Sequence, residues 1–200
     1  MKIKKKEIDI EVILAQTISW LLNPFFILPV ALIAAHLKDI NSNPMPFVFF
    51  VCVGGLPIFF FYLYSEYLHK EKPWEFFINL SRERRNTPLL VGIYSFLFNT
   101  ILFSIFGEYL WVKISILLVI YAGIMYLANK YIDKASWHAG VLAFSIFYIA
   151  DKISLVFAFA LILMPVIFWA RVLLHKHTWL QLYLGTVIGL VIGILSWTIH

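Results

Sequence analysis

The chain has 200 residues, of which 62% are hydrophobic and 14% are charged, and its mean hydropathy is +0.87. Soluble domains carry about 25% charged residues, so this composition excludes an ordinary soluble domain. The net charge of +5 is modest and is not clustered in the way of a nucleic-acid-binding patch. The basic residues instead indicate how the chain is oriented in the membrane and suggest contact with an anionic lipid surface. We predict an all-α, polytopic transmembrane helix bundle of about seven (six to seven) membrane helices, formed by residues 1–200 as one domain.

A membrane-spanning helix needs about 20 mostly apolar residues. In chain order, apolar runs cover residues 12–37, 47–68, 89–106, 109–128, 138–169 and 180–199. The run 138–169 is broken by Asp151 and Lys152, and we expect two short helices joined by a tight turn there, because one helix would place two charges at mid-membrane. This gives seven crossings, of which residues 138–150 form the shortest. The first run is too long for a cleavable signal and lacks a small-residue cleavage site.

The single cysteine and the glycine spacing of the last run also bear on the fold. Cys52 is the only cysteine, so neither an intrachain disulfide nor a cysteine-based metal cage is possible. Gly185, Gly189 and Gly193 recur every four residues in the last run. That spacing places them on one helix face and predicts close packing against a neighbouring helix.

The polar segments between the runs are expected to gather on one side of the membrane. Charges cluster at residues 69–88, 129–138 and 171–177, which follow the second, fourth and sixth crossings. Because even numbers of crossings separate them, all three clusters share a side, together with the lysine-rich start of the chain. The three candidate site segments within them are residues 79–88, 134–140 and 170–181.

The third segment contains Arg171, His177 and Gln181. The planar guanidinium of Arg171 suits phosphate oxygens. His177 lies where the last helix is expected to begin, and Gln181 lies one turn further on the same face. Gln181 can accept the ring N–H of His177, as a nucleophilic or basic histidine requires. The competing interpretation is that these side chains extend toward lipid headgroups.

The second segment contains Ser136 and His138. Ser136 is expected to cap a helix whose first turn presents free backbone amides, and a helix N-terminus is a ready anion site. His138 in that turn could protonate a leaving oxygen. The competing interpretation is an interfacial histidine without a chemical role.

The first segment contains Arg82, Arg84 and Arg85, followed by Pro88. Three arginines beside a membrane either bind anionic headgroups or form a phosphate cradle, and a charged run is often only a solvated face. Phosphoryl transfer needs a histidine nucleophile, a histidine acid and several cations at one place. The three segments together supply this set.

These residues resemble the phosphatidic acid phosphatase type 2-like superfamily. Its third motif reads Ser-Arg-x5-His-x3-Asp, and residues 170–181 read Ala-Arg-x5-His-x3-Gln. Its second motif reads Pro-Ser-Gly-His, and residues 135–138 read Ala-Ser-Trp-His. Its first motif reads Lys-x6-Arg-Pro, which Arg-Glu-Arg-Arg-x-x-Pro at residues 82–88 matches loosely. The resemblance covers residues 81–189, about half of the chain, and the third motif is its most specific part.

Two departures from the family pattern have chemical consequences. Gln181 replaces the aspartate, which is similar to the His-Thr-x-x-Gln version of dolichyl-diphosphatase-like members and of small bacterial members. The Arg-Glu-Arg-Arg-x-x-Pro segment is also similar to that bacterial branch. Trp137 replaces the glycine, so the backbone there approaches phosphate less closely.

The resemblance implies a mechanism without metal or cofactor. His177 attacks phosphorus and forms a phosphohistidine, Gln181 orients it, and His138 protonates the leaving lipid oxygen. The resemblance implies that the phosphate oxygens are held by Arg171 and by one or two of Arg82, Arg84 and Arg85, near the helix N-terminus at Ser136.

The sequence therefore favours a lipid phosphatase that hydrolyses a phosphate or diphosphate monoester. Polyprenyl diphosphate is the first expected substrate because of Gln181, followed by phosphatidate-like lipids. Its expected partners are this lipid phosphate and the membrane lipids, and no nucleic acid. The alternatives are a lipid phosphotransferase and a catalytically degenerate relative that binds or moves anionic lipids.

Charge distribution predicts the side of the membrane on which the site lies. With seven crossings, 13 of the 16 lysines and arginines fall on the side of the three clusters and three fall on the other. Leaving out the four candidate phosphate-binding arginines still leaves nine against three. The positive-inside rule then places the site in the cytoplasm, although the superfamily usually faces its site away from it. We expect a multi-pass protein of the cell inner membrane.

Overall fold

The computed structural model describes residues 10–37, 44–69 and 82–198; within these ranges the side chains at 37, 62, 65–69 and 82–85 are outside the description. Every regular element in the described residues is helical. In chain order, the elements are α1 (Ile10–Leu21), α2 (Pro24–Leu37), α3 (Met45–Phe50), η1 (Val51–Gly55), α4 (Leu56–His69), α6 (Arg82–Phe106), α7 (Tyr109–Tyr131), α8 (Trp137–Lys152), η2 (Leu155–Ile162), α9 (Leu163–Leu173) and α10 (Trp179–Ser196). The predicted all-α class is confirmed.

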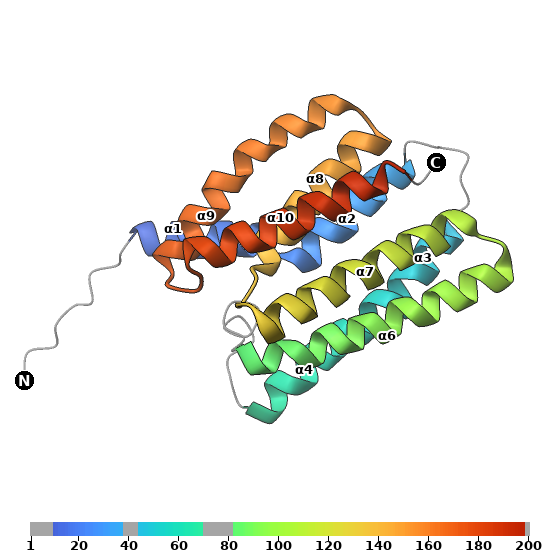
Figure 1. Ribbon diagram of the computed structural model, residues 1–200, viewed down its shortest axis with the longest axis horizontal. Helices are drawn as coiled ribbons and strands as arrows, with labels where there is room; N and C mark the ends of the chain where they lie inside the picture. The colour runs from blue at the N-terminus through green and yellow to red at the C-terminus, as the bar shows by residue number, and fades with distance from the viewer. Residues whose placement is uncertain (1–9, 38–43, 70–81, 199–200) are drawn as a thin grey trace, which may run out of the picture.

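The helices run roughly along one direction and form a bundle (Figure 1). The helix α8 packs against α10 and α2, and α1 packs against α9; α6 packs against α7 and α4. The helix α8 is the most enclosed element in the described part of the chain, and most of its side chains are buried. The candidate site begins at the amino end of this central helix.

Several helices have the length and composition of membrane spans. These are the segments Asn86–Phe106, Tyr109–Tyr131, Leu155–Leu173 and Trp179–Ser196, and the bent pair α1 and α2 is a fifth if it forms one span. The expected six to seven crossings are not confirmed. The helix α8 has 16 residues, about 24 Å at 1.5 Å per residue, which is shorter than the ~30 Å hydrocarbon layer.

Local sequence explains where the helices break. Asn23 accepts the backbone N–H of Phe25 at 2.9 Å and starts α2 after a bend of 43° from α1. The π-helical turn η1 follows α3, and the buried amide of Asn99 donates to the carbonyl of Phe50 at 3.3 Å. The helix α8 ends at Lys152 and η2 begins at Leu155, so the predicted helix break is confirmed, directly after the charged pair at residues 151–152.

The three glycines of α10 pack against α8. A Cβ atom at Gly185 would overlap the carbonyl oxygen of Ser136, and one at Gly189 would overlap the carbonyl oxygen of Gly140. A Cβ atom at Gly193 would lie 2.6 Å from the Cβ atom of Phe147. The prediction of close helix packing is confirmed, and it brings the start of α10 against the start of α8.

Candidate active site

The three candidate segments lie at the same end of the bundle. The turn from α9 to α10, the connection from α7 to α8 and the start of α6 are all found at the left end in Figure 1. The backbone N–H of Ser136 donates to the carbonyl of Gln181 at 3.0 Å, and the ammonium of Lys134 donates to the carbonyl of Lys176 at 3.4 Å. These bonds join the second and third segments directly.

Gln181 is held in place by a capping box at the start of α10. The hydroxyl of Thr178 accepts the backbone N–H of Gln181 at 3.4 Å, and Oε1 of Gln181 accepts the backbone N–H of Thr178 at 3.3 Å. Such reciprocal bonds satisfy two otherwise unpaired helix N–H groups. The amide oxygen of Gln181 is thereby directed toward the residue before the cap, which is His177.

The same amide oxygen contacts His177. Nδ1 of His177 lies 3.1 Å from Oε1 of Gln181, and the imidazole is 6% exposed. Nε2 of Gln181 donates to Oδ1 of Asp133 at 3.1 Å. A carboxylate only accepts hydrogen bonds, so the amide nitrogen must face Asp133 and the amide oxygen must face the ring. Nδ1 therefore carries the proton, and the lone pair of the neutral ring is on Nε2.

Asp133 was not identified from the sequence. It lies in the connection between α7 and α8, and the backbone N–H of Lys134 also donates to it at 2.6 Å. Its only sequence signal is its place three residues before the Ser136 cap, which many loop residues share. In the structure, the Asp133 carboxylate contacts the side-chain amide of Gln181, and that amide in turn contacts His177.

Arg171 lies at the end of α9 and is 1% exposed. Its Nη1 donates to the hydroxyl of Ser19 on α1 at 2.8 Å, and its carbonyl accepts the backbone N–H of Lys176 at 3.0 Å. A guanidinium is seldom fully buried unless polar groups or an anion surround it. Ser19 was not identified from the sequence, where it is one of several polar residues in the first apolar run.

The second segment has the expected local structure. Ser136 caps α8, and its hydroxyl accepts the backbone N–H of Ala139 at 3.4 Å. His138 follows in the first turn and is 5% exposed. Nε2 of His138 and Nε2 of His177 are both buried atoms. The structure thus buries both predicted histidines, His138 in the first turn of α8 and His177 directly before the cap of α10.

The first segment is described in part. The backbone of Arg82, Arg84 and Arg85 begins α6, but the side chains of these arginines lie outside the described residues. Asn86 follows them, and its Oδ1 accepts the Nδ2 group of Asn129 on α7 at 2.6 Å. This bond ties the start of α6 to the end of α7, beside the connection that carries Asp133.

An open depression of about 370 Å³ lies at the turn between α9 and α10. It is lined by Lys134, Val172, His175, Lys176, His177, Thr178 and Gln181. Two lysines thus flank the edge of His177 and Gln181, which makes the depression suited to an anion. Neither lysine was identified as a site residue from the sequence.

The described residues contain no group of three or more histidine, cysteine, aspartate or glutamate side chains that could hold a metal ion. No protein-family model matches the chain, and neither a curated protein nor a solved structure matches it.

Proposed function

We propose that the chain is a membrane lipid phosphatase that hydrolyses a phosphate or diphosphate monoester through a phosphohistidine intermediate. The observation that carries this proposal is the hydrogen-bonded chain Asp133–Gln181–His177. It holds His177 in the tautomer whose lone pair is on Nε2, the atom that would attack phosphorus, and Arg171 is buried nearby in the chain at the end of α9.

The proposed reaction has two steps at phosphorus. In the first, Nε2 of His177 forms a bond to phosphorus, the bond from phosphorus to the lipid oxygen breaks, and His138 gives its proton to that oxygen. In the second, water attacks the phosphohistidine, the nitrogen–phosphorus bond breaks, and His138 takes the proton of the water. Inorganic phosphate leaves from a monophosphate and from the terminal group of a diphosphate alike.

Cations offset the charge that builds up on the phosphoryl oxygens. In this proposal Arg171 and one or two of the arginines at 82, 84 and 85 hold those oxygens, beside the backbone amides in the first turn of α8. The hydrogen bond from Arg171 to Ser19 fixes the guanidinium against α1. The carboxylate of Asp133 provides, through Gln181, part of the negative charge that the family pattern places directly beside the histidine.

We further propose six to seven crossings, an inner-membrane location and a cytoplasmic site. In this arrangement α8 crosses only part of the layer and is covered by α2 and α10, which fits its burial. The lysines Lys134 and Lys176 at the edge of the site add to the positive charge on that side.

The decisive experiment measures phosphate release by purified protein in detergent from polyprenyl and glycerolipid phosphates without added metal. We expect turnover, and His177→Ala should lower kcat by about 10³-fold or more because the nucleophile is lost. His36→Gln is the matched control, because His36 lies on α2, where its ring contacts Phe47 and Trp111, and it does not line the depression.

The outcomes separate the proposed function from its alternatives. A folded His177→Ala protein with near-normal activity would exclude the mechanism. Transfer of the phosphoryl group to an added lipid or sugar, instead of to water, would show a phosphotransferase. Binding of these lipids without any turnover would show a degenerate relative that binds anionic lipids.

A further inference from the structure

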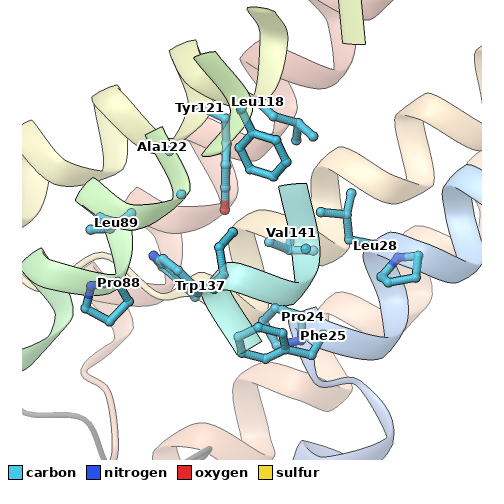
Figure 2. A pocket seen from close by; sticks show the side chains of 15 residues that line it. Pro24, Phe25, Leu28, Pro88, Leu89, Leu118, Tyr121, Ala122, Trp137 and Val141 are labelled. Atoms are coloured by element: carbon cyan, nitrogen blue, oxygen red, sulfur yellow. The ribbon is translucent and has the colours of Figure 1, made fainter. Parts of the chain in front are cut away.

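An apolar cavity of about 120 Å³ lies inside the bundle, between α2, α4, α6, α7 and α8 (Figure 2). Its wall includes Phe25 and Leu28 from α2, Leu89 from α6, and Trp137 and Val141 from α8. Apolar cavities of about this size hold small hydrocarbons such as benzene. The cavity therefore suits a few carbon atoms of a lipid chain.

One polar group of the wall has an unusual environment. The side chain of Tyr121 on α7 is 7% exposed, and its hydroxyl has no hydrogen-bond partner among the described residues. Figure 2 shows the oxygen directed from α7 toward Trp137 and Val141 on α8. Burying a hydroxyl without an acceptor is unfavourable, and a phenylalanine would supply the same ring without that penalty. The hydroxyl therefore points to a bound molecule that offers an acceptor.

The cavity lies close to the phosphate end of the proposed site. Trp137 is placed between Ser136 and His138 in the chain, and the Tyr121 hydroxyl lies beside Gly140, where a Cβ atom would be 2.5 Å from it. Gly140 is one helical turn after the Ser136 cap, about 6 Å along the α8 axis. A ligand with its phosphate at the start of α8 thus brings its next few atoms near Tyr121.

The chemistry of those atoms differs between the two candidate substrates. In a phosphatidate-like lipid, an ester carbonyl lies only a few bonds from phosphorus and accepts hydrogen bonds. In a polyprenyl phosphate, the same stretch is a hydrocarbon without oxygen. We propose that the cavity binds the first part of a glycerolipid chain and that the Tyr121 hydroxyl donates to its ester carbonyl. Tyr121 then selects acylated glycerolipids over polyprenyl substrates.

This inference rests on the proposed function for the phosphate end, so its first test does not require turnover. The thermal unfolding midpoint of delipidated protein in detergent is measured with diacylglycerol and with its dialkyl ether counterpart, which lacks the carbonyl. A ligand that binds only the folded protein raises the midpoint. We expect the diacyl lipid to stabilise the wild type more, and this difference to vanish in Tyr121→Phe.

A matched control separates the hydroxyl from general effects on packing. Tyr148 on α8 is 4% exposed and stacks on Phe144 with ring centroids 5.7 Å apart, and it does not line the cavity. Tyr148→Phe should keep the preference for the diacyl lipid. Without ligand, Tyr121→Phe should be at least as stable as the wild type; a lower midpoint would assign the hydroxyl to folding and overturn the inference.

The second test uses turnover. Loss of one neutral hydrogen bond lowers affinity by about two- to tenfold, so Tyr121→Phe should lower kcat/KM for a phosphatidate by this factor and leave that for a polyprenyl phosphate unchanged. Equal losses on both substrates, or equal stabilisation of the wild type by diacyl and dialkyl lipids, would overturn the inference. Absence of phosphate release from every lipid would instead refute the proposed function, and the binding test would still decide the role of Tyr121.

Discussion

The contacts of Gln181 predict that an amide and a carboxylate can be exchanged between positions 133 and 181. In the wild type, Nε2 of Gln181 lies 3.1 Å from Oδ1 of Asp133, and Oε1 lies 3.1 Å from Nδ1 of His177. Gln181→Glu keeps the shape of the side chain but places a second carboxylate beside Asp133. Adding Asp133→Asn restores one donor and one acceptor in this pair, with the carboxylate now directly on His177.

The size of the effect follows from the distance. Two unit charges 3.1 Å apart repel by about 5 kcal/mol at an effective dielectric constant of 20 and by about 1 kcal/mol in bulk water. Asp133 and Gln181 are both partly exposed, so we take the lower part of this range, about 1–2 kcal/mol. Gln181→Glu should therefore lower kcat by about five- to thirtyfold, since about 1.4 kcal/mol corresponds to a factor of ten.

The single change Asp133→Ala tests the same chain from its other end. It removes one of the two contacts that orient the amide, since the backbone N–H of Thr178 still donates to Oε1. The amide is then less firmly held and turns in a larger fraction of molecules, which presents Nε2 to His177. The ring would then carry its proton on Nε2, where it blocks attack. A hydrogen bond to a charged group contributes about 1.5–3 kcal/mol when buried, and partial exposure reduces this, so we expect kcat to fall by about tenfold.

Two measurements test these predictions for Asp133 and Gln181. Phosphate release gives kcat for Asp133→Ala, Gln181→Glu and the Gln181→Glu/Asp133→Asn double variant, which we expect to regain most of the activity. The ¹⁵N chemical shifts of selectively labelled histidine give the tautomer of His177 without any substrate. An Asp133→Ala protein with wild-type kcat and an unchanged His177 tautomer would refute the reasoning, as would a double variant no more active than Gln181→Glu.

The remaining predictions concern metal, packing and orientation. Chelator should leave phosphate release unchanged, and loss with EDTA followed by recovery with a divalent ion would contradict the mechanism. Gly189→Ala should lower the stability by about 1–3 kcal/mol, because its Cβ atom meets the α8 backbone; Gly123→Ala has no neighbour within 4 Å and should be neutral or stabilising in thermal unfolding. Single cysteines at Lys4 and Lys134 in a Cys52→Ala background should both resist an impermeant thiol reagent on intact cells. Labelling of both from outside would reverse the orientation, and labelling of one would show a different number of crossings.

Local physical chemistry in the sequence determined the helical class and the position of most helix ends. These features depend on residues that are neighbours in the chain. They are the apolar runs of membrane length, the cap at Ser136 and the charged pair at residues 151–152. The contact between His177 and Gln181 could be predicted for the same reason, because residues four apart share a helix face. The glycine spacing in α10 likewise indicated a packed face, but it did not identify the neighbouring helix.

Only the tertiary structure decided which distant side chains meet at the candidate site. Asp133 reaches Gln181 across 48 residues, and Arg171 reaches Ser19 across 152 residues. Nothing in the local pattern distinguishes Asp133 or Ser19 from other polar residues, because their positions depend on how α1, α8, α9 and α10 pack. The direction of the Tyr121 hydroxyl has the same origin. The sequence of α7 by itself shows only that Tyr121 lies on an apolar helix. The packing of α7 against the other helices decides that the hydroxyl oxygen is buried beside Gly140.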